Sequence, residues 1–406
     1  MHLPILLLFT SMILPRTKKS MSWYFTAAIN GQKFPKASIH FSDSASEERD
    51  LSVGRNWMEH LENQEVHGYP GAYDVLRCDL IKTSTSPSAN FKVWGQDYHL
   101  NRLEKSYKVL TNHIMQSNEK RDGIVVQPSA LKAAHEESNA IMNTLLKKMV
   151  EHEESHVKIE AQDHDVVCEI IRVTLLWTPL FDDDSHKIFV RGHASTSGQI
   201  MDPNATPKYI VATVALPNNC SSAQSGGTLN DFPDRHISPH AKISSWSSKR
   251  RPLEKKETFM PGGVAEVLLI EENKTANKQF VLEGLTSNFF AIYRDGSICT
   301  APDGVLLGYV RHLILECAEA CDLRVDERPI DLEDGAKGLW AETFITSSSR
   351  LIYPINKILI PDYEVQIENK GEGLNWKTYW ELDDTIDTKY HKWHHLLSEI
   401  LKRGGY

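Results

Sequence analysis

The sequence predicts a two-domain protein of the mixed α/β class. At 406 residues it is long enough for two compact domains, each with a hydrophobic core of its own. Strand-like and helix-like patterns alternate along it, and residues 191–208, rich in Ser, Thr, Gly and Pro, are the best candidate for a linker. We therefore expect a first domain over residues 21–190 and a second over residues 209–365.

Within the first domain the sequence predicts strands and two helices. The helix-like segments are residues 97–116 and 129–150, and in the second of these apolar side chains recur at helical spacing. The strand-like segments are residues 23–39, 166–177 and 187–190. The polar stretch near residues 44–64 is expected to be a surface insertion.

The second domain is expected to open with a strand at residues 210–216. Strands and helices then alternate to residue 361. Phe289 to Tyr293 has the composition of a buried strand, and Asp295-Gly296 is a hairpin signal. The C-terminal tail, residues 366–406, is expected to be helical.

Charge and cysteine content exclude several classes of protein. A net charge of −9 and a pI near 6.1 argue against nucleic acid as a partner, because such binders need a basic face. Six cysteines without a CxxC pair do not form a disulfide scaffold, so we expect a reducing, cytoplasmic location.

The apolar run at residues 3–14 is too short to span a bilayer comfortably. We therefore expect residues 1–20 to be either dispensable to the fold or a targeting segment. As a targeting segment they would direct the protein to an organelle or to secretion. We expect no other association with membranes.

Glu283 is the most informative residue of the chain. It ends the apolar run Phe280-Val281-Leu282 and precedes a run of turn-forming residues. A carboxylate in such a setting is unfavourable unless a cation or hydrogen-bond donors meet it. A protonated heterocycle would meet this need.

The run that contains Glu283, EGLTSNFF, resembles the EGxxSNFF motif of the fold-type IV pyridoxal-phosphate enzymes. This class IV aminotransferase family includes branched-chain and D-amino-acid aminotransferases and aminodeoxychorismate lyase. Further segments resemble family motifs in the family's order, and the resemblance spans about residues 25 to 361. They are Ala28 to Gly31, Gly71 to Arg77, His99 to Ser106, Thr300-Ala301-Pro302, Leu306 to Arg311, Glu327-Arg328-Pro329-Ile330, Phe344 to Ser349 and Tyr353-Pro354-Ile355.

The resemblance implies a fold, a cofactor and two central residues. The fold is α/β (α+β), with a small N-terminal α/β domain and a larger C-terminal β-barrel-like domain, and the cofactor is pyridoxal 5'-phosphate. Lys242 stands at the position of the family lysine, 41 residues before Glu283, and would form the covalent bond with the cofactor and move the Cα proton. Its apolar and serine neighbours would desolvate the amine and lower its pKa. Glu283 would keep the ring nitrogen protonated.

The phosphate group of the cofactor needs a cation and neutral donors. By resemblance these are Arg102, the hydroxyls of Thr346 and Ser347, and the backbone N–H groups of Tyr309 and Val310 at the start of a helix. Leu306 would pack on one face of the ring. Tyr309 and Val310 replace a family isoleucine and threonine, so one side-chain hydroxyl is lost. Trp246 is a second departure, because several relatives carry a tyrosine nearby.

The substrate residues and the reaction stay open at this point. Tyr73 lines the pocket or fills the core, and Arg172 binds a substrate carboxylate or forms a structural ion pair. The resemblance implies a homodimer that transfers an amino group between an amino acid and a 2-keto acid. The alternatives are a lyase of the same fold and a cofactor-free binding protein.

A metal site was the competing hypothesis. His152 to His156 match the HExxH pattern, which on a helix would present two imidazoles to zinc. Charged residues crowd this segment and no third ligand is evident, so we expect a solvated helix end and no bound metal.

Overall fold

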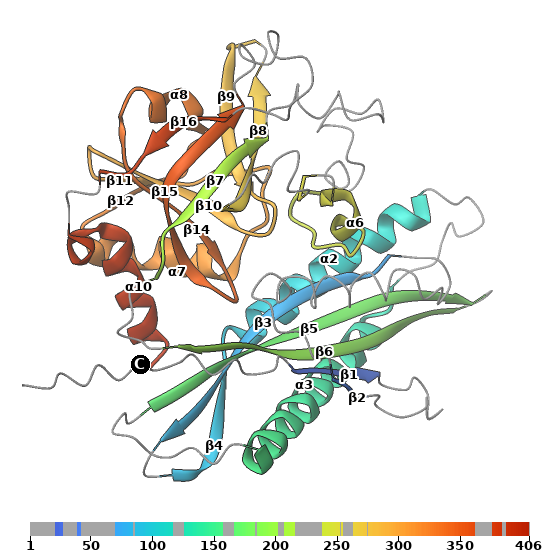
Figure 1. Cartoon of the computed structure of the whole chain (residues 1–406). Helices are drawn as coiled ribbons and strands as arrows, with labels where there is room; N and C mark the ends of the chain where they lie inside the picture. The colour runs from blue at the N-terminus through green and yellow to red at the C-terminus, as the bar shows by residue number, and fades with distance from the viewer. Residues whose placement is uncertain are drawn as a thin grey trace, which may run out of the picture.

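The computed structural model shows two packed units, each built on one β-sheet (Figure 1). The description covers residues 21–26, 39–41, 70–83, 86–116, 126–156, 166–182, 185–201, 207–215, 238–251, 253–254, 263–273, 275–361, 376–383 and 387–405. Residues 1–20 and the expected insertion at 44–64 lie outside these ranges.

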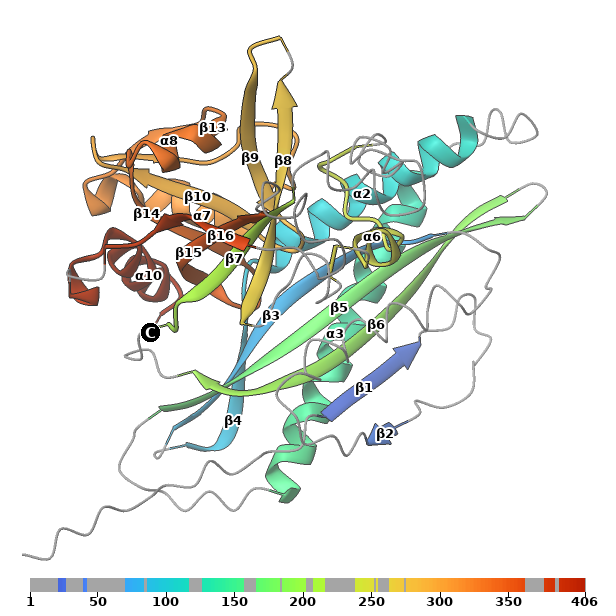
Figure 2. The same ribbon diagram turned by 45° about the horizontal axis from the view of Figure 1, so that its top comes forward.

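The first unit is an antiparallel sheet of six strands in the order β2-β1-β6-β5-β3-β4. The strands are β1 (Met21–Thr26), β2 (Ile39–Phe41), β3 (Ala72–Thr83), β4 (Ser86–Val93), β5 (Val166–Asp182) and β6 (Ser185–Met201). Helices α2 (Gln96–Gln116) and α3 (Pro128–His156) pack against it, as the two views in Figures 1 and 2 show. Both helices were predicted from the sequence, α3 from its apolar periodicity.

Strand alternation gives this sheet two different faces. Leu76, Val173 and Ala194 stand in register on β3, β5 and β6 and are fully buried in the core that includes α2 and α3. Because side chains alternate along a strand, the neighbouring residues point the other way. Those residues include Thr174 and His193, and they line a cavity between the two units.

The prediction of a linker from residue 191 is wrong. Strand β6 continues to Met201 and pairs with β5 along this length, so its second half belongs to the first sheet. The described chain then resumes at residue 207, just before β7.

The second unit is a barrel-like sheet. The strands are β7 (Ile210–Ala215), β8 (Val264–Asn273), β9 (Lys278–Gly284), β10 (Asn288–Tyr293), β11 (Ser297–Cys299), β12 (Arg324–Asp326), β13 (Ile330–Asp331), β14 (Trp340–Ser347), β15 (Leu351–Pro361) and β16 (Trp376–Glu381). Pairing of β9 with β10, through Glu283 and Asn288, closes the path β10-β14-β15-β7-β8-β9 into a ring. Buried apolar side chains such as Phe289, Ala291 and Ile345 form one core of this unit. The predicted mixed α/β class with a β-barrel-like second domain is confirmed.

Short helices complete the second unit. They are α6 (Trp246–Arg250), α7 (Tyr309–Cys317), α8 (Leu332–Ala336) and α10 (Lys392–Arg403), with the 3-10 turns η4 (Glu319–Cys321) and η5 (Thr388–Tyr390). The expectation of a helical tail is correct for α10 and wrong for β16, which adds a strand to β15. No helix in the described ranges is long and apolar enough to cross a membrane.

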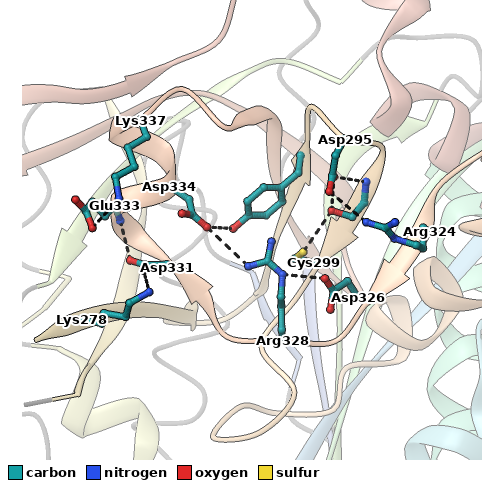
Figure 3. Close-up of polar contacts among 12 residues, drawn as sticks. Lys278, Asp295, Cys299, Arg324, Asp326, Arg328, Asp331, Glu333, Asp334 and Lys337 are labelled. Atoms are coloured by element: carbon teal, nitrogen blue, oxygen red, sulfur yellow. Dashed lines mark hydrogen bonds and ion pairs between the residues drawn. The ribbon is translucent and has the colours of Figure 1, made fainter. Parts of the chain in front are cut away.

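A polar network joins β10, β11, β12 and α8 (Figure 3). The Tyr293 hydroxyl donates to Asp334 at 2.8 Å, and the Arg328 guanidinium lies 4.5 Å from the Tyr293 ring centre while pairing with Asp326 at 2.8 Å. None of these side chains lines the cavity. The network therefore fastens elements of the barrel, and we assign it no chemistry.

Candidate active site

One cavity of about 280 Å³ lies between the first sheet, α6 and the barrel. All ten residues singled out from the sequence line it: Tyr73, Arg102, Arg172, Lys242, Glu283, Leu306, Tyr309, Val310, Thr346 and Ser347. They come from β3, α2, β5, the segment before α6, β9, the loop before α7, α7 itself and β14. The fold thus brings together residues that are up to 274 positions apart in the chain. Their individual roles stay predictions.

The backbone around Lys242 is fixed by the first sheet and by α2. The Tyr73 N–H donates to the Lys242 carbonyl at 2.9 Å, and the Lys242 N–H donates to Ser106 Oγ at 3.0 Å. Two residues after Lys242, the Ser244 N–H donates to the Gly71 carbonyl at 2.8 Å, and the Gly71 N–H donates to Ser244 Oγ at 3.0 Å. Lys242 is therefore held by backbone hydrogen bonds at the edge of the cavity, although it lies in a loop.

The Lys242 amine is partly buried among charges. About 21% of its side chain is accessible, Nζ lies 3.9 Å from Asp74 Oδ1, and it lies 5.2 Å from the centre of the Tyr73 ring. Burial lowers the pKa of Lys242 to about 8, with Asp74 acting against this and Arg102 and Arg250 adding to it. A lower pKa raises the fraction of neutral amine near pH 7, and the neutral amine is the nucleophilic form.

Glu283 ends β9 inside the same cavity, where it is 9% exposed. Its Oε2 accepts hydrogen bonds from Asn288 Nδ2 at 3.2 Å and from the Leu306 N–H at 3.0 Å. Asn288 Nδ2 also donates to the Leu306 carbonyl at 2.6 Å. Asn288 therefore holds both the carboxylate and the loop that carries Leu306, a role that the sequence did not reveal.

A second buried carboxyl supports the turn after Glu283. Glu266 accepts from the Leu285 N–H at 3.2 Å and from Ser287 Oγ at 2.8 Å, and burial raises its pKa. A Cβ at Gly284 would lie 2.8 Å from the Glu266 carboxyl carbon and 2.2 Å from Ser287 Oγ. Only glycine fits here, because the turn is filled by the carboxyl group behind it.

The part of the cavity wall formed by β14 and the start of α7 carries groups suited to an anion. Helix α7 begins at Tyr309 without a side-chain cap, so the N–H groups of its first turn, including those of Tyr309 and Val310, have no partner within the helix. Thr346 Oγ1 and Ser347 Oγ are buried and have no hydrogen-bond partner among the described residues. Buried polar groups are normally paired, so these donors fit a phosphate group that binds between them. Val310 itself is 2% exposed and belongs to an apolar core cluster with α10, so its backbone is the part that can serve an anion.

Arg102 lies in the cavity wall but is also engaged within the protein. Its Nε and Nη2 donate to Asp74 at 2.8 and 2.6 Å, Nη1 donates to the Leu307 carbonyl at 2.9 Å, and Nη2 lies 3.1 Å from His99 Nδ1. Burial would raise the pKa of Asp74, but Arg102 and then His99 hold it well below its usual range. At least three of the five guanidinium hydrogens are thus used within the described chain, and Nη1 keeps a second hydrogen that can serve an anion. The sequence did not predict this pair with Asp74.

The wall formed by the first sheet carries further polar side chains. Arg172 and Thr174 come from β5, and Ser195 and His193 are their register partners on β6. Burial, together with the charge of Arg172, lowers the pKa of His193 to about 3, so this imidazole is neutral at pH 7. Tyr73 also faces the cavity, which places it where it can contact a ligand.

No group of three or more metal-ligating side chains occurs among the described residues. The backbone of the HExxH segment belongs to α3, but its side chains lie outside the description.

The fold brings a lysine and a carboxylate to one cavity, whose wall also carries buried hydroxyls without a partner among the described residues. Residues 168–358 match the family described as amino-transferase class IV, and the resemblance noted from the sequence is thereby confirmed. This stretch contains Arg172, Lys242, Glu283 and Thr346.

Solved structures of similar proteins include branched-chain amino acid aminotransferases. The one from Escherichia coli is 15% identical, with 84% of this chain and 87% of that chain covered and a TM-score of 0.46. The one from the archaeon Thermoproteus uzoniensis, solved with norvaline, is 17% identical, with 82% and 84% covered and a TM-score of 0.47. A hypothetical aminotransferase from Mycobacterium tuberculosis in its PLP-bound form is 13% identical, with 84% and 91% covered and a TM-score of 0.46. The comparison with curated proteins gave no match.

Proposed function

We propose that this protein is a pyridoxal-phosphate-dependent aminotransferase that transfers an amino group between an amino acid and a 2-keto acid. One observation supports this most strongly: Lys242 and Glu283 line a single cavity whose wall also carries the hydroxyls of Thr346 and Ser347, which have no partner among the described residues. The family match over residues 168–358 supports the same class of chemistry.

The residues present fit the cofactor. Thr346, Ser347 and the first turn of α7 would hold the phosphate group, with one remaining hydrogen of Arg102. Glu283, fixed by Asn288 and the Leu306 N–H, would face the ring nitrogen. When bound, the cofactor supplies an electron sink for the bond that breaks at the substrate Cα.

Lys242 has two tasks in this proposal. Its Nζ would hold the cofactor covalently in the resting enzyme and, once released, would accept the proton from the substrate Cα. A pKa of about 8 suits both, because a useful fraction of the amine is neutral at pH 7 to 8. Asp74, at 3.9 Å, keeps the protonated form from becoming too unfavourable.

Substrate binding completes the proposal. Arg172 would contact the carboxylate of the amino or keto acid, and Tyr73 would line its path to Lys242. We also propose a homodimer, which sedimentation of the purified protein would test.

The test is an amino-transfer assay with D- and L-amino acids as donors and pyruvate or 2-oxoglutarate as acceptors. We expect equal amounts of new amino acid and new keto acid, and none with Lys242→Ala. Pyruvate release from aminodeoxychorismate without an acceptor would instead indicate the lyase alternative. A protein that takes up no pyridoxal phosphate would contradict both enzymatic functions.

A further inference from the structure

Arg250 is a buried cation in the cavity for which the proposed function has no role. It is the last residue of α6, lies eight positions after Lys242, and is 9% exposed. Its neighbour Arg251 is exposed to solvent. Burial of one arginine of such a pair requires a reason, because desolvation of a charge is unfavourable unless partners replace water.

Among the described residues Arg250 has one ion-pair partner. Nε lies 3.0 Å from Glu254 Oε1, and Glu254 also lines the cavity. Tyr73 also lines the cavity; burial raises the pKa of its hydroxyl, and the charge of Arg250 opposes this rise. A guanidinium group has four further hydrogens on Nη1 and Nη2, more than one phenol hydroxyl can accept.

Arg250 also adds to a concentration of positive charge around the lysine. Five basic side chains line the cavity against three acidic ones, and Asp74, which lies outside the lining, pairs with Arg102; the lining residues are Arg102, Arg172, Lys242, Arg250 and Arg350, and Glu254, Glu266 and Glu283. Arg102 and Arg250 both disfavour protonation of Lys242. Like charges held together in a buried site are unfavourable, and an anion that binds among them relieves this.

The indole N–H of Trp246, the other large polar group of α6, is already used within the protein. Trp246 Nε1 donates to the Leu285 carbonyl at 2.9 Å, so the indole N–H serves the turn beside Glu283. Arg250 is therefore the charged donor that α6 presents to the cavity.

We propose that Arg250, together with the Tyr73 hydroxyl, forms an oxyanion-binding subsite beside Lys242, separate from the phosphate-binding end. The ligand is either the ring oxygen of bound pyridoxal phosphate or a carboxylate of the substrate. Both ligands present a negatively charged oxygen to Arg250. The assignment of either one rests on the proposed function.

The first experiment uses the cofactor-free protein. Maleate is titrated in, and protection of Lys242 from acetylation is followed by mass spectrometry. We expect protection in the wild type and in the matched control Arg251→Gln, and at least tenfold more maleate for the same protection in Arg250→Gln. Arg250→Lys should recover part of the protection by maleate, and Tyr73→Phe should weaken the protection several-fold. These two variants test the subsite even if Arg250→Gln does not fold. Equal protection in wild type, Tyr73→Phe and Arg250→Lys, or in wild type and Arg250→Gln, overturns the proposal.

The second experiment identifies the source of the oxyanion. The absorbance of pyridoxal phosphate bound to the protein is titrated with pH in the absence of substrate. A higher midpoint in Arg250→Gln than in wild type assigns the ring oxygen, because the cation no longer stabilises it. An unchanged midpoint with at least tenfold weaker binding of the keto acid substrate assigns the carboxylate, and a change in neither overturns the subsite. A wild type that binds no pyridoxal phosphate would contradict the proposed function, while the maleate experiment still decides the subsite.

Discussion

Lys242→Met should stabilise the cofactor-free protein at pH 7. The pKa of Lys242 is lowered from its ordinary value of 10.5 to about 8, chiefly by burial. At about 1.4 kcal/mol per pH unit, this difference corresponds to up to about 3 kcal/mol. The folded state binds fewer protons than the unfolded state between these two pKa values, so protonation of Lys242 opposes folding at low pH. The penalty is complete below about pH 8 and disappears as the pH rises through about 10.5. Methionine keeps the apolar length of the side chain and removes the charge.

The assay is urea denaturation of both cofactor-free proteins at several pH values between 7 and 10.5. Titration of every other group affects both proteins similarly, so the difference in the free energy of unfolding isolates Lys242. We expect the variant to be more stable by up to about 3 kcal/mol at pH 7, with the difference shrinking steadily at higher pH. A variant that is less stable than wild type, or a difference that does not change with pH, would show that the amine is solvated and that its environment does not activate it.

Three further predictions concern the anion-binding end and the support of Glu283. Thr346→Val should raise the stability of the cofactor-free protein by about 1 kcal/mol, because it removes a buried hydroxyl without a described partner, and should weaken cofactor binding roughly tenfold by titration. Thr343→Val removes a similarly buried hydroxyl outside the cavity, so equal losses of cofactor affinity in the two variants would refute the assignment. Asn288→Ala should cost about 1–3 kcal/mol in urea denaturation and weaken cofactor binding, since the hydrogen bonds to Glu283 and Leu306 are lost; unchanged values of both would contradict the role of Asn288. Gly308→Ala should lower both stability and cofactor affinity. The φ of −74° at Gly308 suits alanine, but the added Cβ would lie 2.2 Å from Asn288 Oδ1. A fully stable variant with normal affinity would show that Asn288 can move freely.

The sequence predicted correctly those helices and strands whose own residues show a clear apolar pattern. The helical spacing in α3 and the apolar run of β10 were sufficient to place them. The second half of β6 was missed because its Ser, Thr and Gly residues are typical of a linker. They form a strand because β1 and β5 pair with them, and no local pattern contains this information. The strand β16 was missed for the same reason, since it is formed by its pairing with β15.

The site was predictable where one residue was conspicuous on its own. Glu283 stood out as an acid at the end of an apolar strand, and the family resemblance then indicated Lys242. Asp74, Glu266 and Arg250 were not singled out, because each acquires its meaning from a contact made by the fold. Asp74 meets Arg102 from 28 positions away and Glu266 meets Ser287 from 21 positions away. In the sequence alone they are ordinary charged residues.

The most direct test of the enzymatic account is to find where pyridoxal phosphate binds covalently. The purified protein is incubated with the cofactor, reduced with borohydride, digested and examined by mass spectrometry. We expect one pyridoxyl phosphate group per chain, on Lys242, and none there after Lys242→Ala. Label spread over other lysines such as Lys249, or no label at all, would contradict it.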